Sequence, residues 1–193
     1  MNLKNIIIKN RCYRRFYQNE KIDYNKILDW IDLARLSSSA KNMQALKYFI
    51  SNEEETNNEI FQTLQWAGYL KDWKGPEKGE QPSAYVCIFL DKNITDNNYC
   101  DHGIALQSIL LGAVNDGYGG CIIAAFNKKT IKKIAKTSEH LEPLIVLALG
   151  KPKEIVNIYE IDNNEDIKYW RDENNVHQVP KRKLKDIIIS SKP

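Results

Sequence analysis

The alternation of apolar and polar positions along the chain predicts a mixture of helices and strands. Ala84–Leu90 is almost continuously apolar, as is typical of a central strand covered on both faces. Asp101 to about Asp116 is apolar around most of its girth, so we expect a helix buried on several sides. Asp23 and Asp101 are expected to cap the helices that follow them. The other expected elements are helices over 23–36, 53–65 and 128–136, one or two helical turns over 3–9, and strands over 46–51, 121–125 and 144–149.

The last part of the chain, from Lys153 to Pro193, has a different character. It is polar and shows no core pattern of its own until Ile187–Ile189. A segment that cannot bury itself must pack on another surface, and a partner subunit is the natural candidate. We therefore expect one domain over residues 1–193, with an arm from about 153 to 193 that packs on the partner of a homodimer.

Composition narrows the classes of function. The chain is 42% hydrophobic and 27% charged, which is ordinary for a soluble globular protein. A net charge of +3 is too small to imply nucleic acid as the main partner, although it leaves cations for a phosphate. The longest apolar runs, such as Leu144–Leu149, fall far short of the ~20 residues that span a membrane. Since the N-terminus does not read as a signal peptide, we expect a cytoplasmic protein with no membrane partner.

The four cysteines and three histidines are scattered along the sequence. They form no CxxC pair and no spacing typical of zinc ligands, so we expect no metal site.

Several short motifs, in the same order along the chain, together resemble the nitroreductase family. They are RCYRRF at Arg11–Phe16, SSAKNMQ at Ser38–Gln44, DHGIALQ at Asp101–Gln107, GYGGC at Gly117–Cys121, and Gly150 with Pro152. Each motif alone has little specificity, but their colinearity from about residue 5 to residue 190 makes the match specific. The resemblance implies an α+β sandwich in which a mixed, mainly antiparallel sheet is flanked by helices. It also implies an intertwined homodimer with flavin mononucleotide (FMN) at the subunit interface.

The activity implied by the resemblance is that of an FMN-dependent oxidoreductase. NADH or NADPH would be the co-substrate, and a nitroaromatic, quinone or enone would be the small-molecule electron acceptor in a ping-pong reaction. Hydride would pass through flavin N5, so no catalytic side chain is required. Two alternatives stay open: a relative with different flavin chemistry, such as dehalogenation or flavin breakdown, and a non-enzymatic binder of flavin or nucleic acid.

The N-terminal cluster carries cations suited to a phosphate, because guanidinium groups bind phosphate through paired charge-assisted hydrogen bonds. By resemblance, Arg11 holds the phosphate or ribityl end of FMN, and Arg14 lies near the pyrimidine side of the ring. Cys12 stands where the family usually has serine, and a thiol makes a weaker hydrogen bond to the same groups. The alternatives are solvated surface arginines and a catalytic cysteine with a pKa lowered by the two cations.

The second motif supplies amide side chains that can pair with the pyrimidine edge of a flavin. The resemblance gives this role to Asn42 and Gln44, together with the backbone near Ser39. An ordinary polar turn is the alternative. The family's proline before Ser39 is replaced by Ser38, and its Pro-Trp by Ala45-Leu46. Both replacements predict a less rigid loop.

The strand after the GYGGC turn ends in two small residues. In the resembling family, the backbone amide at the position of Ala124 points at flavin N5. Small side chains at Ala124 and Ala125 would let the ring approach. A plain strand end is the alternative.

Basic residues cluster again near the C-terminus, in PKRKLK at Pro180–Lys185. A solvated face and a nucleic-acid site are both compatible with such a run. The resemblance suggests instead that the arm closes over the FMN phosphate, with Arg182 as the first choice and Lys181 or Lys183 as alternates.

Trp66, Tyr69 and Trp73 recur at helical spacing, which predicts one apolar helical stripe. The simplest interpretation is a packed surface helix. The functional interpretation is a lid whose aromatic side chains line the substrate pocket.

Overall fold

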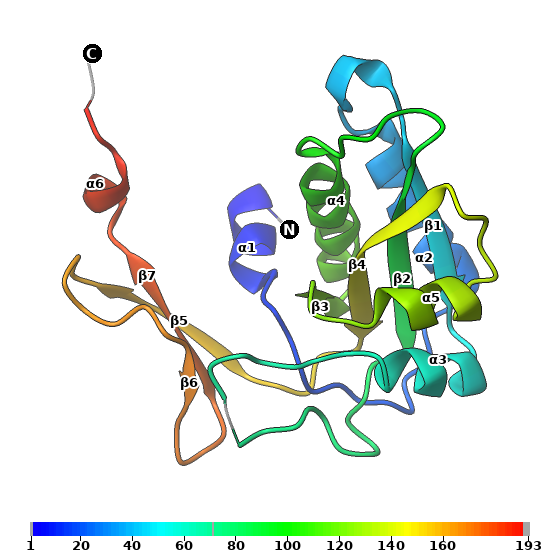
Figure 1. The fold of residues 1–193 in the computed structure, drawn as a ribbon. Helices are drawn as coiled ribbons and strands as arrows, with labels where there is room; N and C mark the ends of the chain where they lie inside the picture. The colour runs from blue at the N-terminus through cyan, green and yellow to red at the C-terminus, as the bar shows by residue number, and fades with distance from the viewer. Residues whose placement is uncertain (1, 71, 191–193) are drawn as a thin grey trace. The chain divides into compact units, whose positions relative to one another are not determined.

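The computed structural model describes residues 2–70 and 72–190 and divides into two compact units (Figure 1). The first unit comprises Met1–Trp66 and Lys74–Lys153, and the second comprises Ala67–Trp73 and Glu154–Pro193. The expectation of one domain whose arm packs on a partner subunit stays a prediction.

The first unit is built on a four-stranded antiparallel sheet. Its strands are β1 (Leu46–Ser51), β2 (Ala84–Asp91), β3 (Gly119–Ile123) and β4 (Leu141–Gly150), in the order β1-β2-β4-β3. This confirms the mainly antiparallel sheet. The expected strand over 121–125 is displaced, because β3 already pairs from Gly119, opposite Gly150, and ends at Ile123. Ala124 and Ala125 therefore follow the strand.

Helices cover both faces of this sheet, as Figure 1 shows. The side chains of Ala84, Val86 and Ile88 on β2 join one core cluster with α2 (Tyr24–Leu36) and α4 (Asp101–Asn115). On the other face, α3 (Glu54–Phe61) contacts β2 and α5 (Lys128–Ile134) contacts β4. Successive side chains of a strand point to opposite faces, so β2 is buried along nearly its whole length. Each fully buried side chain of this kind contributes about 1.5–3 kcal/mol.

The helices form largely where periodicity predicts them. The Asp23 carboxylate accepts a hydrogen bond from the Asn25 N–H at 2.8 Å, which confirms it as the N-cap of α2. The expected turns at the N-terminus are α1 (Leu3–Lys9). The helix expected over 53–65 is shorter, ending at Phe61. Among the helices of the described residues, none has the length and apolar character needed to cross a membrane.

The second unit contains a small mixed sheet that the sequence did not predict. In it β7 (His177–Arg182) pairs in parallel with β5 (Val156–Ile161) and antiparallel with β6 (Trp170–Arg171), and α6 (Leu184–Ile187) follows. Ile161 is 3% exposed. The sequence shows no core pattern in this part because short strands with few apolar residues leave no clear period.

The predicted helical stripe of aromatic residues is also wrong. Ala67 has a φ of 43°, a left-handed conformation that does not continue a right-handed helix. Trp66 consequently belongs to the first unit, where it is buried and its ring lies 5.9 Å from that of Phe61. Tyr69 and Trp73 belong to the second unit.

Candidate functional site

The N-terminal motif lies alongside β3. Cys12 forms a parallel bridge with Gly120, and the Tyr13 N–H donates to the Gly120 carbonyl at 3.0 Å. A Cβ atom on Gly119 would lie 2.5 Å from the Tyr13 ring, and one on Gly120 would lie 2.5 Å from the Ala148 carbonyl oxygen. The paired glycines of the GYGGC motif therefore allow the N-terminal segment and β4 to approach β3 closely.

Arg11 has an unsatisfied donor in this segment. Its Nη2 donates to the Ile7 carbonyl at 2.9 Å, whereas its buried Nε has no hydrogen-bond partner within the described part of the chain. No carboxylate among the described residues forms an ion pair with Arg11. A buried, unpaired donor on a cation is costly, so Arg11 is suited to binding an anion.

Arg14 is only 7% exposed, which excludes a solvated surface role. Its Nη1 donates to the Cys12 carbonyl at 3.3 Å. The side chain therefore braces the backbone turn that carries Arg11 and Cys12.

Arg15 belongs to a separate ionic cluster. Its Nη2 lies 2.7 Å from Glu80 Oε1, and Lys153 Nζ lies 2.9 Å from the same oxygen. These cations, and first of all the hydrogen bond from Arg15, lower the pKa of Glu80 to about 2. Phe16 N–H also donates to the Glu80 carbonyl at 2.9 Å. The cluster anchors the N-terminal motif and neutralises Arg15, a role that the sequence alone did not reveal.

Cys12 is exposed, and the buried Cys121 lies beside it. The pKa of Cys12 is lowered to about 6, first by a hydrogen bond from the Cys121 thiol and then by the charge of Arg14, the Ile122 N–H and the charge of Arg11, while burial of the sulfur opposes the shift. The described residues contain no group of three His, Cys, Asp or Glu side chains that could hold a metal ion. The low pKa of Cys12 arises from a neighbouring thiol, two guanidinium groups and a backbone N–H.

The Ser38–Gln44 motif forms a tight loop between α2 and β1. This loop lies beside the first residue of α4. Ser39 Oγ accepts from the Gln44 N–H at 2.9 Å, and Gln44 Nε2 donates to the Asn42 carbonyl at 3.3 Å. Lys41, Asn42 and Gln44 have φ values of 51°, 55° and 52°. Left-handed backbone at three non-glycine residues costs free energy and is typical of sites with a fixed binding geometry. The loop is well braced despite the loss of the family's prolines.

Asp101 supplies an external brace for this loop. Cys100 occupies the N-cap position of α4, so the prediction that Asp101 caps the helix is wrong. The Asp101 carboxylate instead accepts a hydrogen bond from the Ala40 N–H at 2.9 Å. A carboxylate in the first helical turn still interacts favourably with the helix dipole.

A cavity of about 160 Å³ opens beside the loop. Burial and the nearby charge of Asp101 raise the pKa of Tyr48 in its wall to about 12, so this hydroxyl stays protonated and can donate a hydrogen bond. The cavity is lined by Ala34, Arg35, Ser37, Ser38, Ser39, Gln44, Leu46, Tyr48, Asp101 and Ala105. Ser39 and Gln44, which are two of the predicted cofactor residues, thus line this cavity.

Ala124 and Ala125 form an exposed turn beyond β3. The Ala125 carbonyl accepts from the Gln65 N–H at 2.9 Å, and Phe126 forms a bridge with Leu64. The turn is therefore held in place and its small side chains leave its surface accessible. The predicted orientation of the Ala124 amide toward a flavin stays a prediction.

The structure brings some of the predicted residues together but not all. Arg11, Cys12 and Arg14 lie beside the strand that leads to Ala124. The Ser39–Gln44 loop is held at the start of α4 by Asp101, and near the middle of the same helix Gln107 Oε1 accepts from Asn10 Nδ2 at 3.2 Å. Six helical positions separate Asp101 from Gln107, or about 9 Å along the axis.

The C-terminal basic residues belong to the second unit. Lys181 and Arg182 end β7 and are exposed, whereas Lys183 Nζ forms an ion pair with Asp162 at 2.7 Å. Of the three residues, Lys183 is thus already neutralised within its own unit.

The aromatic residues considered for the substrate pocket also have defined partners. The Tyr69 ring lies 5.0 Å from that of Tyr169, and the Arg171 guanidinium lies 4.2 Å from the centre of the Trp73 ring. An open depression of about 530 Å³ in this unit is lined by Tyr69, Leu70, Asp72, Trp73 and Arg171.

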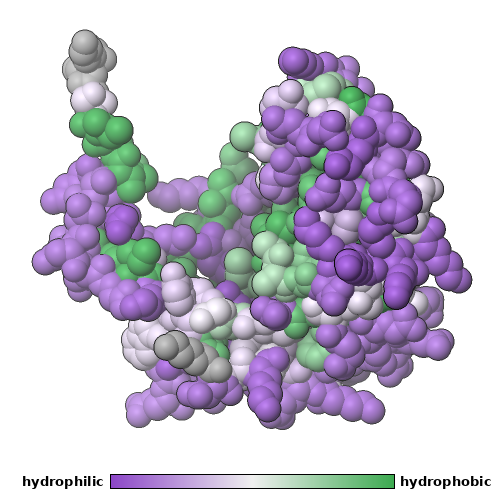
Figure 2. Space-filling model, in the orientation of Figure 1, coloured by the Kyte–Doolittle hydropathy of each residue, from purple (hydrophilic) through white to green (hydrophobic). Residues whose placement is uncertain are grey.

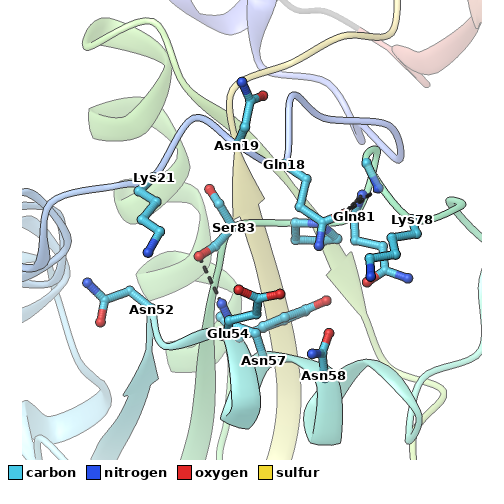
Figure 3. Close-up of a pocket in the computed structure, with 13 residues that line it drawn as sticks. Gln18, Asn19, Lys21, Asn52, Glu54, Asn57, Asn58, Lys78, Gln81 and Ser83 are labelled. Atoms are coloured by element: carbon cyan, nitrogen blue, oxygen red, sulfur yellow. Dashed lines mark hydrogen bonds between the residues drawn. The ribbon is translucent and has the colours of Figure 1, made fainter.

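A further cavity, of about 370 Å³, lies away from all predicted site residues (Figure 3). Asn57 Nδ2 donates to the Ser83 carbonyl at 2.9 Å in its wall. Ser83 Oγ and Tyr85 Oη are buried without a hydrogen-bond partner in the described part of the chain. Its other lining residues are Gln18, Asn19, Lys21, Asn52, Glu54, Asn58, Lys78, Gly79, Gln81 and Pro82. No signal in the sequence pointed to this polar cavity.

Comparison with known proteins gives a consistent result. The sequence profile of the nitroreductase family matches residues 8–151. YodC of Bacillus subtilis (strain 168), a proposed NAD(P)H nitroreductase, is 22% identical over 176 residues, covering 75% of this chain and 87% of YodC. A nitroreductase family protein of Clostridium novyi NT is 26% identical, with a TM-score of 0.66 over 79% of this chain and 88% of that one. A proposed nitroreductase of Exiguobacterium sibiricum 255-15, solved in complex with FMN, is 18% identical, with a TM-score of 0.65 over 80% of this chain and 90% of that one.

Proposed function

Because the chain belongs to the nitroreductase family, we propose that it is an FMN-dependent oxidoreductase that uses NADH or NADPH to reduce a small electrophilic acceptor. The acceptor classes are nitroaromatics, quinones and enones, and the reaction is ping-pong. The names of YodC and of the FMN-bound Exiguobacterium protein support both the nucleotide and the flavin. When bound, FMN would supply hydride transfer between the nucleotide and the acceptor.

The observation that carries the proposal is the buried, unpartnered Nε of Arg11. A phosphate would satisfy this donor and balance the charge of the guanidinium group. The residues present therefore fit FMN, with Arg11 at the phosphate or ribityl end and Cys12 beside it. Lys181 and Arg182 are the exposed cations of the arm proposed to close over the same phosphate.

The remaining contacts to the flavin are assigned to polar and backbone groups. Arg14 would favour negative charge on the pyrimidine side of the ring. Asn42 and Gln44, with Ser39, would pair with the pyrimidine edge, and the Ala124 amide would donate toward the reactive face next to the small Ala125. None of these side chains needs to gain or lose a proton.

We also propose that the site is completed in a homodimer. On α2, Leu33 and Leu36 are 43% and 66% exposed, and Ile104 on α4 is 37% exposed. In the second unit, the apolar segment that follows β7 is visible in Figure 2 near the C-terminal end, and Ile189 is fully exposed. Apolar surface of this extent typically marks an interface.

Tyr69 and Trp73 are proposed to contact the acceptor, since both line an open depression. The rings would stack on a planar substrate. Trp66 is instead buried within the first unit.

The decisive experiment is anaerobic titration of the purified protein with NADH and, separately, with NADPH. The protein should carry a yellow chromophore that one or both nucleotides bleach and that an added quinone restores. A folded preparation that stays colourless and does not take up FMN would contradict the proposal. Bound flavin that neither nucleotide bleaches would leave a non-enzymatic flavin binder. The solution mass should be that of two chains.

A further inference from the structure

Two cysteines that are distant in sequence meet where the N-terminal segment runs beside β3. The bridge between Cys12 and Gly120 places Cys12 next to Cys121, the following residue of β3. The Cys121 thiol donates a hydrogen bond to the Cys12 sulfur when the latter is ionised, and the Ile122 N–H donates to the same sulfur. Cys121 Sγ also lies 3.9 Å from the Ile122 carbonyl oxygen, to which it can donate a long hydrogen bond.

The two thiols differ in accessibility. Cys12 is exposed, whereas Cys121 is only 4% exposed. An oxidant can therefore reach Cys12 from solvent, and the second thiol lies immediately behind it. Exposed cysteines poised next to a resolving cysteine are typical of reversible oxidation sites.

The electrostatic surroundings favour the reactive form of Cys12. Arg11 and Arg14 are the charged groups that act on it, and both stabilise a thiolate. With a pKa of about 6, the sulfur is mostly ionised near neutral pH. Burial instead raises the pKa of Cys87 to about 12, so that thiol is inert.

We propose that Cys12 and Cys121 form a reversible redox pair, in which Cys12 is the site of attack on hydrogen peroxide and Cys121 is the resolving thiol. The Cys12 thiolate attacks one peroxide oxygen, the O–O bond breaks, and hydroxide leaves, so that Cys12 becomes a sulfenic acid. The Cys121 sulfur then attacks the Cys12 sulfur, and the S–O bond breaks with loss of water. The two thiols lose two electrons in total, and peroxide is reduced to two waters once hydroxide takes up a proton.

Both sulfurs and both arginines belong to the first unit of this chain, so a single subunit contains every group of the pair. Oxidation would tie the N-terminal motif covalently to β3. A thiol reductant such as dithiothreitol would reverse the modification.

The test is peroxide treatment of the pre-reduced full chain, followed by thiol blocking, proteolysis without reductant and mass spectrometry. The expected product is a peptide pair joined through Cys12 and Cys121, formed equally in Cys100→Ser as a matched control. The disulfide should be absent in Cys12→Ser. In Cys121→Ser, sulfenic acid should accumulate at Cys12 and be trapped by dimedone.

The rate at Cys12 supplies a second readout on the wild-type chain. It should rise as pH increases through about 6 and, near neutral pH, exceed that of an unperturbed cysteine peptide roughly tenfold. A Cys12 rate no faster than the peptide, or a disulfide that joins Cys12 to Cys100, would overturn the proposal. Peptide mapping of the wild-type chain shows whether the Cys12–Cys121 disulfide forms, even if Cys121→Ser does not fold.

Discussion

The Asp101 carboxylate accepts a hydrogen bond from the Ala40 N–H at 2.9 Å and so joins the start of α4 to the loop that carries Ser39, Asn42 and Gln44. Asp101 is 7% exposed. A buried carboxylate with a backbone donor makes a stronger hydrogen bond than two neutral groups. The geometry of the loop therefore depends on a side chain about sixty residues further along the chain.

We expect Asp101→Ala to release this loop. The unfolding free energy should fall by about 1–3 kcal/mol, because the Ala40 N–H loses a charged acceptor. The FMN dissociation constant should rise about tenfold through the loss of preorganisation. Chemical denaturation and flavin fluorescence measure the two effects. Asp101→Asn, which keeps an acceptor oxygen, should recover most of the loss, and Asp96→Ala, at an exposed position, is the control.

Arg11→Ala should weaken FMN binding much more than folding. Loss of a charge-assisted contact of about 1.5–3 kcal/mol corresponds to a roughly 10- to 100-fold weaker affinity. Arg14→Ala should reduce both affinity and stability, because Arg14 is buried and holds the Cys12 carbonyl. Lys133→Ala, at an exposed residue of α5, is the control. Unchanged flavin affinity in Arg11→Ala would contradict the placement of the phosphate.

The arm should contribute through Arg182 rather than Lys183. Lys183 already pairs with Asp162, so Lys183→Ala should alter FMN affinity by less than about twofold. Arg182→Ala should weaken binding several-fold, and the difference should shrink at high salt because the contact is electrostatic. Equal effects of the two substitutions would argue against this assignment.

We expect Glu80 to make the unfolding free energy decrease at acid pH. Its pKa in the folded chain, about 2, lies below its ordinary value of 4.5, so the folded state binds fewer protons than the unfolded state. The stabilisation is present above pH 4.5 and is lost as the pH falls from there toward 2. Urea denaturation of Glu80→Gln at stepwise lower pH should show a flatter dependence than wild type. Glu139→Gln, at a fully exposed side chain, should follow the wild-type curve.

Gly120→Ala should destabilise the first unit. The new Cβ would lie 2.5 Å from the Ala148 carbonyl oxygen, and backbone there cannot move without disturbing β4. We expect a loss of about 1–3 kcal/mol, measured by thermal or urea denaturation. Gly103→Ala, in the same unit and with nothing within 4 Å of the new atom, is the matched control. A Gly120→Ala variant as stable as the control would show that the close approach is not required.

Local features of the sequence were sufficient for most of the first unit. The strand Leu46–Ser51 and the helix from Asp101 follow directly from residue type and periodicity, because burial against a sheet imposes a strict spacing on apolar side chains. The N-cap at Asp23 likewise depends only on neighbouring residues. The colinear motifs were enough to identify the family.

Only the tertiary structure decided how distant residues are paired. The meeting of Cys12 with Cys121, the clamp of Arg15 on Glu80 and the use of Asp101 by Ala40 all join segments far apart in sequence. No periodicity encodes such contacts, since they depend on the approach of whole elements. The sequence also could not show that the helix predicted from Trp66 onward does not form. Its apolar residues have helical spacing, but Ala67 adopts a left-handed backbone conformation that does not continue a right-handed helix.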